Sequence, residues 1–94
     1  MNRRSMGYTP VMEKRETSFA TDIRPLFRPI DIKHMSPMGV LLDDYTYMSD
    51  AQNAQTVYEY LTGERQPQMP TDGAYWNEDQ LQLFSDWMGG GRKP

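Results

Sequence analysis

The stretch 77–91, NEDQLQLFSDWMGGG, constrains the fold of this chain more than any other part of the sequence. Asn77 is of a residue type that favours helix N-caps, and Gln80 three residues later completes a capping-box pair. Glycines 89–91 are expected to end the helix. Because so short a helix is marginal alone, its apolar stripe must pack on another element. The stripe consists of Leu81, Phe84, Trp87 and Met88.

A second helical stripe predicts that order begins near Ser18, which together with Thr21 is a candidate cap. Pro29 is expected to end or kink this helix near Arg28, because proline disfavours helical geometry in the residue before it. Residues 31–35 are expected to add one further helical turn. The apolar residues of this stripe are Phe19, Ile23, Leu26 and Ile30.

A middle helix is predicted to open at Ser49, with Asp50 as its first residue, and to end before Gly63. The residues 40–42, Val-Leu-Leu, are expected to tuck into the core, and 66–73 forms a loop with two prolines. We therefore predict an all-α fold with three helices in one domain, 18–94, preceded by a flexible tail, 1–17. The middle stripe consists of Ala51, Ala54, Val57, Tyr58 and Leu61.

Composition excludes several classes of protein. The chain has no cysteine, so it has no disulfide, thiolate metal site or thioether bond. No apolar run is long enough to span a membrane, and the start of the chain does not look like a signal peptide, so we expect a cytoplasmic protein. The tail carries four Lys/Arg and two Glu, whereas the rest carries six basic and eleven acidic residues. The net negative charge of residues 18–94 argues against nucleic acid as a partner, because nucleic acid is itself negatively charged.

The order of the motifs resembles class I cytochrome c domains of the short bacterial kind. Ile23–Phe27, IRPLF, is similar to the helical lead-in of that family, and 40–42 with the helix 49–62 is similar to its middle region. Met69–Pro70 stands where the family has the methionine that binds haem iron. Residues 79–90 fit the closing pattern that ends in Trp-Met-x-x-Gly. The resemblance covers about four-fifths of the chain and implies the cytochrome c-like fold.

The sequence departs from this family where the haem should be attached. Asp31 and His34 stand at the places of the two cysteines of Cys-x-x-Cys-His, and Met35 stands at that of the histidine. Without thiols no covalent haem attachment is possible. The resemblance therefore implies a relative of cytochrome c that has kept the packing helices and lost the cofactor.

The methionines at and near the expected haem site have three possible roles. Met35 and Met69 are candidate ligands for a non-covalent haem b. The alternative is that they refill the vacated volume, since methionine adapts to irregular gaps and a haem-sized void is costly. His34, Met35 and Met38 also form a possible cluster of soft ligands for copper.

Other chemistry has little support in the sequence. Asp43, Asp44 and Asp50 do not follow the spacing of a calcium-binding loop, so turn and cap roles are expected for them. The single histidine has no cysteine partner, and no serine lies in a nucleophile motif. The sequence predicts no enzyme.

Apolar residues at two places are candidate contacts to a partner. Tyr8, Val11 and Met12 are the anchors of the tail, which is expected to order on a partner. Tyr75 and Trp76 add aromatic surface before the last helix, where Trp76 is also a candidate hydrophobic staple.

The first functional hypothesis is a haem-free, cytochrome c-like protein-binding module with no cofactor, acting as an accessory or stabilising subunit of a larger complex such as one containing an oxidoreductase. The second is an electron-transfer protein that holds haem b or copper through Met35, Met69 and His34. A third, a domain that binds another small ligand in the former haem pocket, has no specific motif in its favour.

Overall fold

The structure is a computed structural model that describes residues 16–94. These residues form helices joined by turns, and the described part contains no strand, only an isolated bridge between Ser18 and Lys93. The all-α class predicted from the sequence is therefore confirmed for this part of the chain. The elements are η1 (Phe19–Ile23, a π-helix), η2 (Arg24–Leu26, a 3-10 helix), α1 (Pro29–Met35), η3 (Ser36–Met38, a 3-10 helix), α2 (Tyr45–Met48), α3 (Ala51–Thr62) and α4 (Glu78–Gly89).

The two longest helices have strong caps. The Asn77 side chain accepts a hydrogen bond from the backbone N–H of Gln80, and the Gln80 side chain accepts one from that of Asn77, both at 2.9 Å. This capping box begins α4 where the sequence predicts it. For α3 the cap is Asp50, one residue later than predicted, because its carboxylate accepts from the N–H of Asn53. Gly63 ends α3 with a φ of 90°.

The first helical stripe does not form one continuous helix. Pro29 holds Arg28 in an extended conformation and starts α1 as a separate helix, so the break falls where proline was expected to make it. The new direction changes which apolar side chain is buried. Phe27 is 3% exposed, whereas Ile30, predicted to belong to the stripe, is 58% exposed.

An additional short helix, α2, lies between the predicted elements. Asp44 caps it by accepting a hydrogen bond from the N–H of Tyr47. The N-cap roles of Asp44 and Asp50 agree with the expectation that these carboxylates serve local structure. Val40 and Leu42 are buried, as predicted for the apolar run before this helix.

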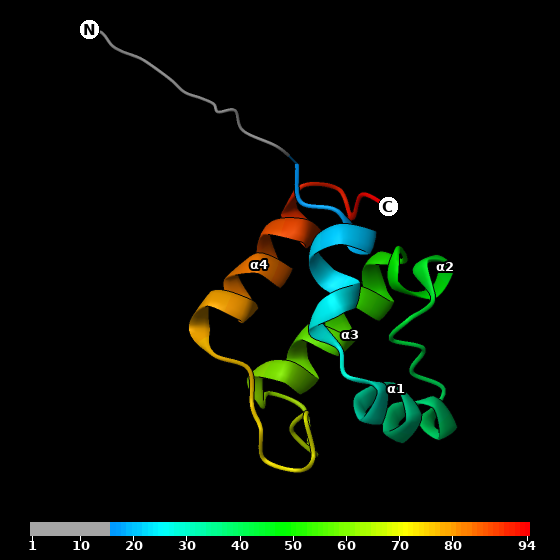
Figure 1. The fold of residues 1–94 in the computed structure, drawn as a ribbon, viewed down its shortest axis with the longest axis vertical. Coiled ribbons are helices and arrows are strands. Elements are labelled where there is room, and N and C mark those ends of the chain that lie inside the picture. Colours follow the sequence, from blue (N-terminus) through cyan, green and yellow to red (C-terminus); the bar gives the residue numbers. More distant parts are fainter. Residues whose placement is uncertain (1–15) are drawn as a thin grey trace, which may run out of the picture.

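Aromatic side chains fill the core where η1 and α3 pack against α4 (Figure 1). The rings of Phe19 and Trp87 join η1 to α4 with centroids 5.7 Å apart, and those of Tyr58 and Phe84 join α3 to α4 at 5.9 Å. Phe84 and Trp87 are fully buried. Trp76, just before α4, packs on Phe84 as well.

The last three residues, 92–94, form what we call the C-terminal clamp. The carbonyl oxygen of Lys93 accepts hydrogen bonds from the Phe19 N–H and from the Trp87 indole N–H, both at 2.9 Å. Figure 1 shows this segment beside the start of η1. The clamp also contacts α2 and its C-cap. The Tyr45 hydroxyl donates to the carbonyl oxygen of Arg92, and the Arg92 guanidinium donates to the carbonyl oxygen of Ser49.

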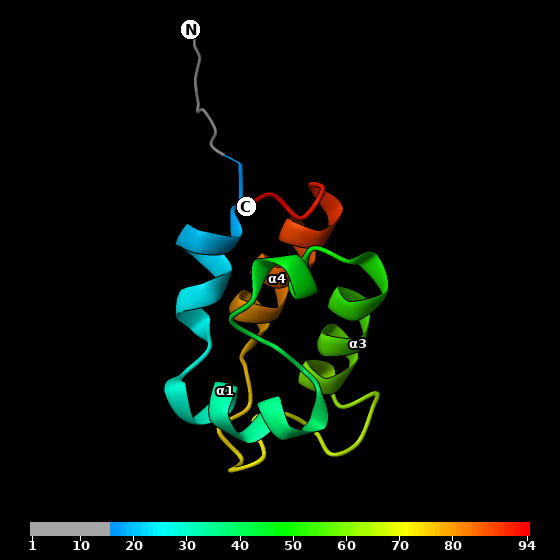
Figure 2. The same cartoon turned by 90° about the vertical axis from the view of Figure 1, so that its right-hand side faces the viewer.

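At the opposite end of the molecule, α1 lies next to the loop 63–77, as Figure 2 shows. In this loop the N–H of Met69 donates to the carbonyl oxygen of Tyr60 in α3, at 2.9 Å. This end holds the cavities described below. None of the helices in the described part is long and apolar enough to cross a membrane.

Candidate functional site

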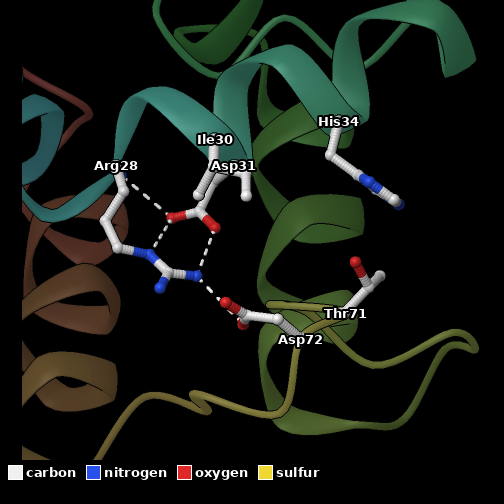
Figure 3. Close-up of a pocket in the computed structure, with 6 residues that line it drawn as sticks. All are labelled: Arg28, Ile30, Asp31, His34, Thr71 and Asp72. Carbon is white, nitrogen blue, oxygen red and sulfur yellow. Dashed lines mark hydrogen bonds and ion pairs between the residues drawn. The ribbon is translucent and has the colours of Figure 1, made fainter.

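A cleft of about 280 Å³ separates α1 from the loop 63–77 (Figure 3). One wall is α1 and the other is formed by Thr71 and Asp72. His34 extends from α1 over the cleft toward Thr71. The lining residues are Arg28, Ile30, Asp31, His34, Thr71 and Asp72.

Arg28 connects the two walls of this cleft. Its guanidinium donates to both carboxylate oxygens of Asp31, at 2.7 and 3.0 Å, and to Asp72 at 3.1 Å. The Asp31 carboxylate, which is buried, also accepts the backbone N–H of Arg28 and so closes a capping box at the start of α1. The two carboxylates raise the pKa of Arg28, so its positive charge is already balanced by Asp31 and Asp72 within the domain.

The pKa of Asp72 depends on its hydrogen bond with Arg28. Its pKa is lowered from the ordinary 3.8, first by the hydrogen bond from Arg28 and next by the backbone N–H of Ala74. A carboxylate with a lowered pKa stabilises the fold above its unfolded pKa, and this contribution is lost as pH falls through the folded pKa. The effect on stability is small, because the pair is exposed to solvent.

We therefore expect Arg28→Gln to raise the pKa of Asp72 toward 3.8. An NMR titration of the side-chain carboxyl carbon measures this directly. The amide signals of α1 in the same spectra serve as the control for an intact helix. An unchanged Asp72 pKa in the variant would show that Arg28 does not hold this loop in solution.

A second, much smaller cavity adjoins the cleft, because the two share Asp31, His34 and Thr71. Its volume is about 10 Å³, and Met35 and Met69 line it from opposite segments. Both methionines are nearly fully buried, at 1% and 2% exposure. A cavity of this size admits about one water molecule or one ion.

The residues present do not fit a haem. The described part has no cysteine to hold one, and the space between Met35 and Met69 is far below the several hundred cubic ångströms, roughly 300 or more, of a typical cofactor pocket. Both methionines are buried, and the refilling of a former haem volume by them stays a prediction.

The structure places only some of the predicted soft ligands at the same cavity. His34 and Met35 lie at the small cavity, but Met38 in η3 is 49% exposed and does not line it. Met69, far away in the sequence, takes its place. Met38 lies in the 3-10 turn η3, which follows α1 and contains Pro37, so it does not join His34 and Met35 at this cavity. Copper binding by His34, Met35 and Met38 stays a prediction.

The outer face of α1 presents an apolar side chain beside positive charge. Ile30, Lys33, His34 and Pro37 line an open hollow of about 420 Å³. Lys33 is exposed and forms no ion pair with any other residue in the range 16–94. We call the surface formed by these four residues the α1 face.

The residues predicted to contact a partner differ in their exposure to solvent. Tyr75 is 53% exposed, as a partner contact requires. Trp76 is 8% exposed, because its ring packs on Phe27 with centroids 5.3 Å apart, so it belongs to the core. Tyr8, Val11 and Met12 lie outside the described residues.

Sequence reasoning did not find Arg28, Thr71 and Asp72 as site residues. One local signal existed: Arg28-Pro29-x-Asp31 places proline at the first and an acid at the third residue of a helix, which is typical of a helix start. No local signal connects Arg28 to Asp72, which is 44 residues away.

The described residues contain no group of three or more His, Cys, Asp or Glu side chains that could hold a metal ion. Comparison with models of protein families, with curated proteins and with solved structures finds no match to this chain.

Proposed function

We propose that this chain is a non-catalytic protein-binding module, an accessory subunit that docks through its α1 face onto an acidic surface of a larger protein. The observation that carries this proposal is Ile30. Its side chain is 58% exposed and lines an open hollow with Pro37 and with Lys33, which forms no ion pair within residues 16–94. An exposed apolar surface rimmed by polar residues is typical of a protein interaction site.

Charge supports an acidic partner. Residues 24–34 contain three Lys/Arg and one Asp, whereas the rest of 18–94 contains three Lys/Arg and ten Asp/Glu. Residues 24–34 therefore carry a net positive charge, whereas the rest of 18–94 is net negative. Because Arg28 is paired with Asp31 and Asp72, Lys33 is the lysine that the α1 face itself presents to a partner. Complementary charge would steer the encounter and set its orientation.

We further propose that the domain is a haem-free relative of class I cytochrome c and that its partner is a redox enzyme. The packing of η1 on α4 through Phe19 and Trp87 supports the kinship, and the absence of thiols from the chain supports a form without covalently attached haem. The cytoplasmic location stays a prediction from the sequence.

The test starts from the complex that co-purifies with the full-length chain from its native source. Lys33→Glu and Ile30→Ser are each expected to weaken that complex by about tenfold or more, as anchors near the centre of an interface do. Added salt should weaken the wild-type complex in the same direction.

Lys93→Glu is the matched control, because it makes the same charge change at an exposed lysine at the other end of the domain. Equal losses from Lys33→Glu and Lys93→Glu would contradict docking at the α1 face. Self-association that Ile30→Ser abolishes, measured by sedimentation, would assign the face to a second copy of the chain and overturn the proposal of a larger partner.

A further inference from the structure

We propose that Met35, Met69 and His34 form a binding site for one soft monovalent metal ion, Cu(I). The site is independent of the docking proposed above. Met35, Met69 and His34 come from two segments that are far apart in sequence, and all three line one cavity of about 10 Å³. The volume that is too small for a haem suits a single ion.

The chemistry of the ligands selects the ion. Thioether sulfur is a soft, neutral ligand that favours Cu(I), and imidazole binds copper as well. Hard divalent cations prefer carboxylate and carbonyl oxygens, and the one carboxylate at the cavity, Asp31, already has both oxygens bound by Arg28. A neutral ligand set in a buried place also favours a single charge over a double one, because the cost of desolvation rises with charge.

The surroundings provide a free ligand and a route for entry. His34 is exposed, and its side chain forms no hydrogen bond or ion pair with any other residue in the described part of the chain. His34 lines both the cleft and the small cavity, and it is exposed whereas Met35 and Met69 are buried, so an ion arriving from solvent can reach the histidine before the methionines.

The scaffold holds the two ligand-bearing segments together without the ion. Arg28 ties α1 to Asp72, three residues after Met69, and the Met69 N–H is bonded to Tyr60. A site that is already assembled loses less conformational entropy when the ion binds.

The experiment is a competition for Cu(I) between the full-length chain and a chromophoric Cu(I) chelator under reducing conditions. We expect the wild type to withdraw one Cu(I) per chain. Met69→Leu and His34→Gln should each weaken binding by about tenfold or more, since even outer-shell changes at metal sites cost about 10- to 100-fold in affinity.

Met38→Leu is the matched control, because Met38 is exposed and lies outside the cavity. Leucine preserves the volume of methionine, so both Met→Leu variants should fold, and circular dichroism checks this. In a parallel titration with Ag(I), the methyl signals of Met35 and Met69 should shift and that of Met38 should not. A wild type that leaves all Cu(I) on the chelator, or a Met38→Leu variant as weak as Met69→Leu, would overturn the site.

Discussion

Removing Arg92–Pro94 is expected to lower the free energy of unfolding by about 3 kcal/mol or more, although the segment buries no apolar side chain. The clamp accepts hydrogen bonds from η1, from the indole of Trp87 and from the hydroxyl of Tyr45, and Arg92 donates to Ser49. Each such bond contributes about 0.5–1.5 kcal/mol. The loss should be larger where the donor, like the Trp87 N–H, belongs to a buried side chain.

Chemical denaturation followed by circular dichroism measures this effect. Lys93→Ala is the control, because the contacts of Lys93 to η1 and Trp87 use only its carbonyl oxygen, so its stability should stay within about 0.5 kcal/mol of the wild type. If the truncated chain and Lys93→Ala unfold at the same denaturant concentration, the clamp does not stabilise the fold.

Phe84→Ala is expected to cost about 3–5 kcal/mol, the usual range for deleting a buried aromatic ring. Phe84 is fully buried, and its ring contacts those of Tyr58, Trp76 and Trp87, with centroids 5.9, 6.1 and 5.4 Å away. A loss of this size is a large fraction of the 5–15 kcal/mol, approximately, that stabilises a typical domain. We therefore expect the variant to be largely unfolded at elevated temperature.

A thermal melt monitored by far-ultraviolet circular dichroism tests the prediction. Tyr75→Ala removes an aromatic ring that is more than half exposed, and its melting temperature should stay close to that of the wild type. Similar melting temperatures for Phe84→Ala and the wild type would mean that α3 and α4 do not pack through this ring.

How far the sequence predicts this structure depends on whether the signal is local. The capping box of Asn77 and Gln80 and the terminal Gly63 act within a few residues, and both long helices lie where these signals place them. The break at Pro29 was also foreseen, but not its consequence, that α1 turns away and exposes Ile30. Periodicity describes one helix axis and cannot report a change of axis.

The candidate site was predicted only in part, since its contacts join distant segments. His34 and Met35 are neighbours in the chain, whereas their approach to Met69 depends on how the loop returns beside α1. The ion pair of Arg28 with Asp72 likewise joins residues that are far apart in sequence. The sequence also gives no sign that Met38 is exposed while Met69 is buried.

The hydrogen bonds between η1 and residues 93 and 94 also have a consequence for biosynthesis. While the chain is still emerging from the ribosome, the N–H groups of Phe19 and Ala20 lack their native acceptors, and Phe19 lacks the ring of Trp87. Contacts between such distant residues are slow to form, because a long loop must close before they are gained. The described domain can therefore reach its native packing only after translation has passed residue 94.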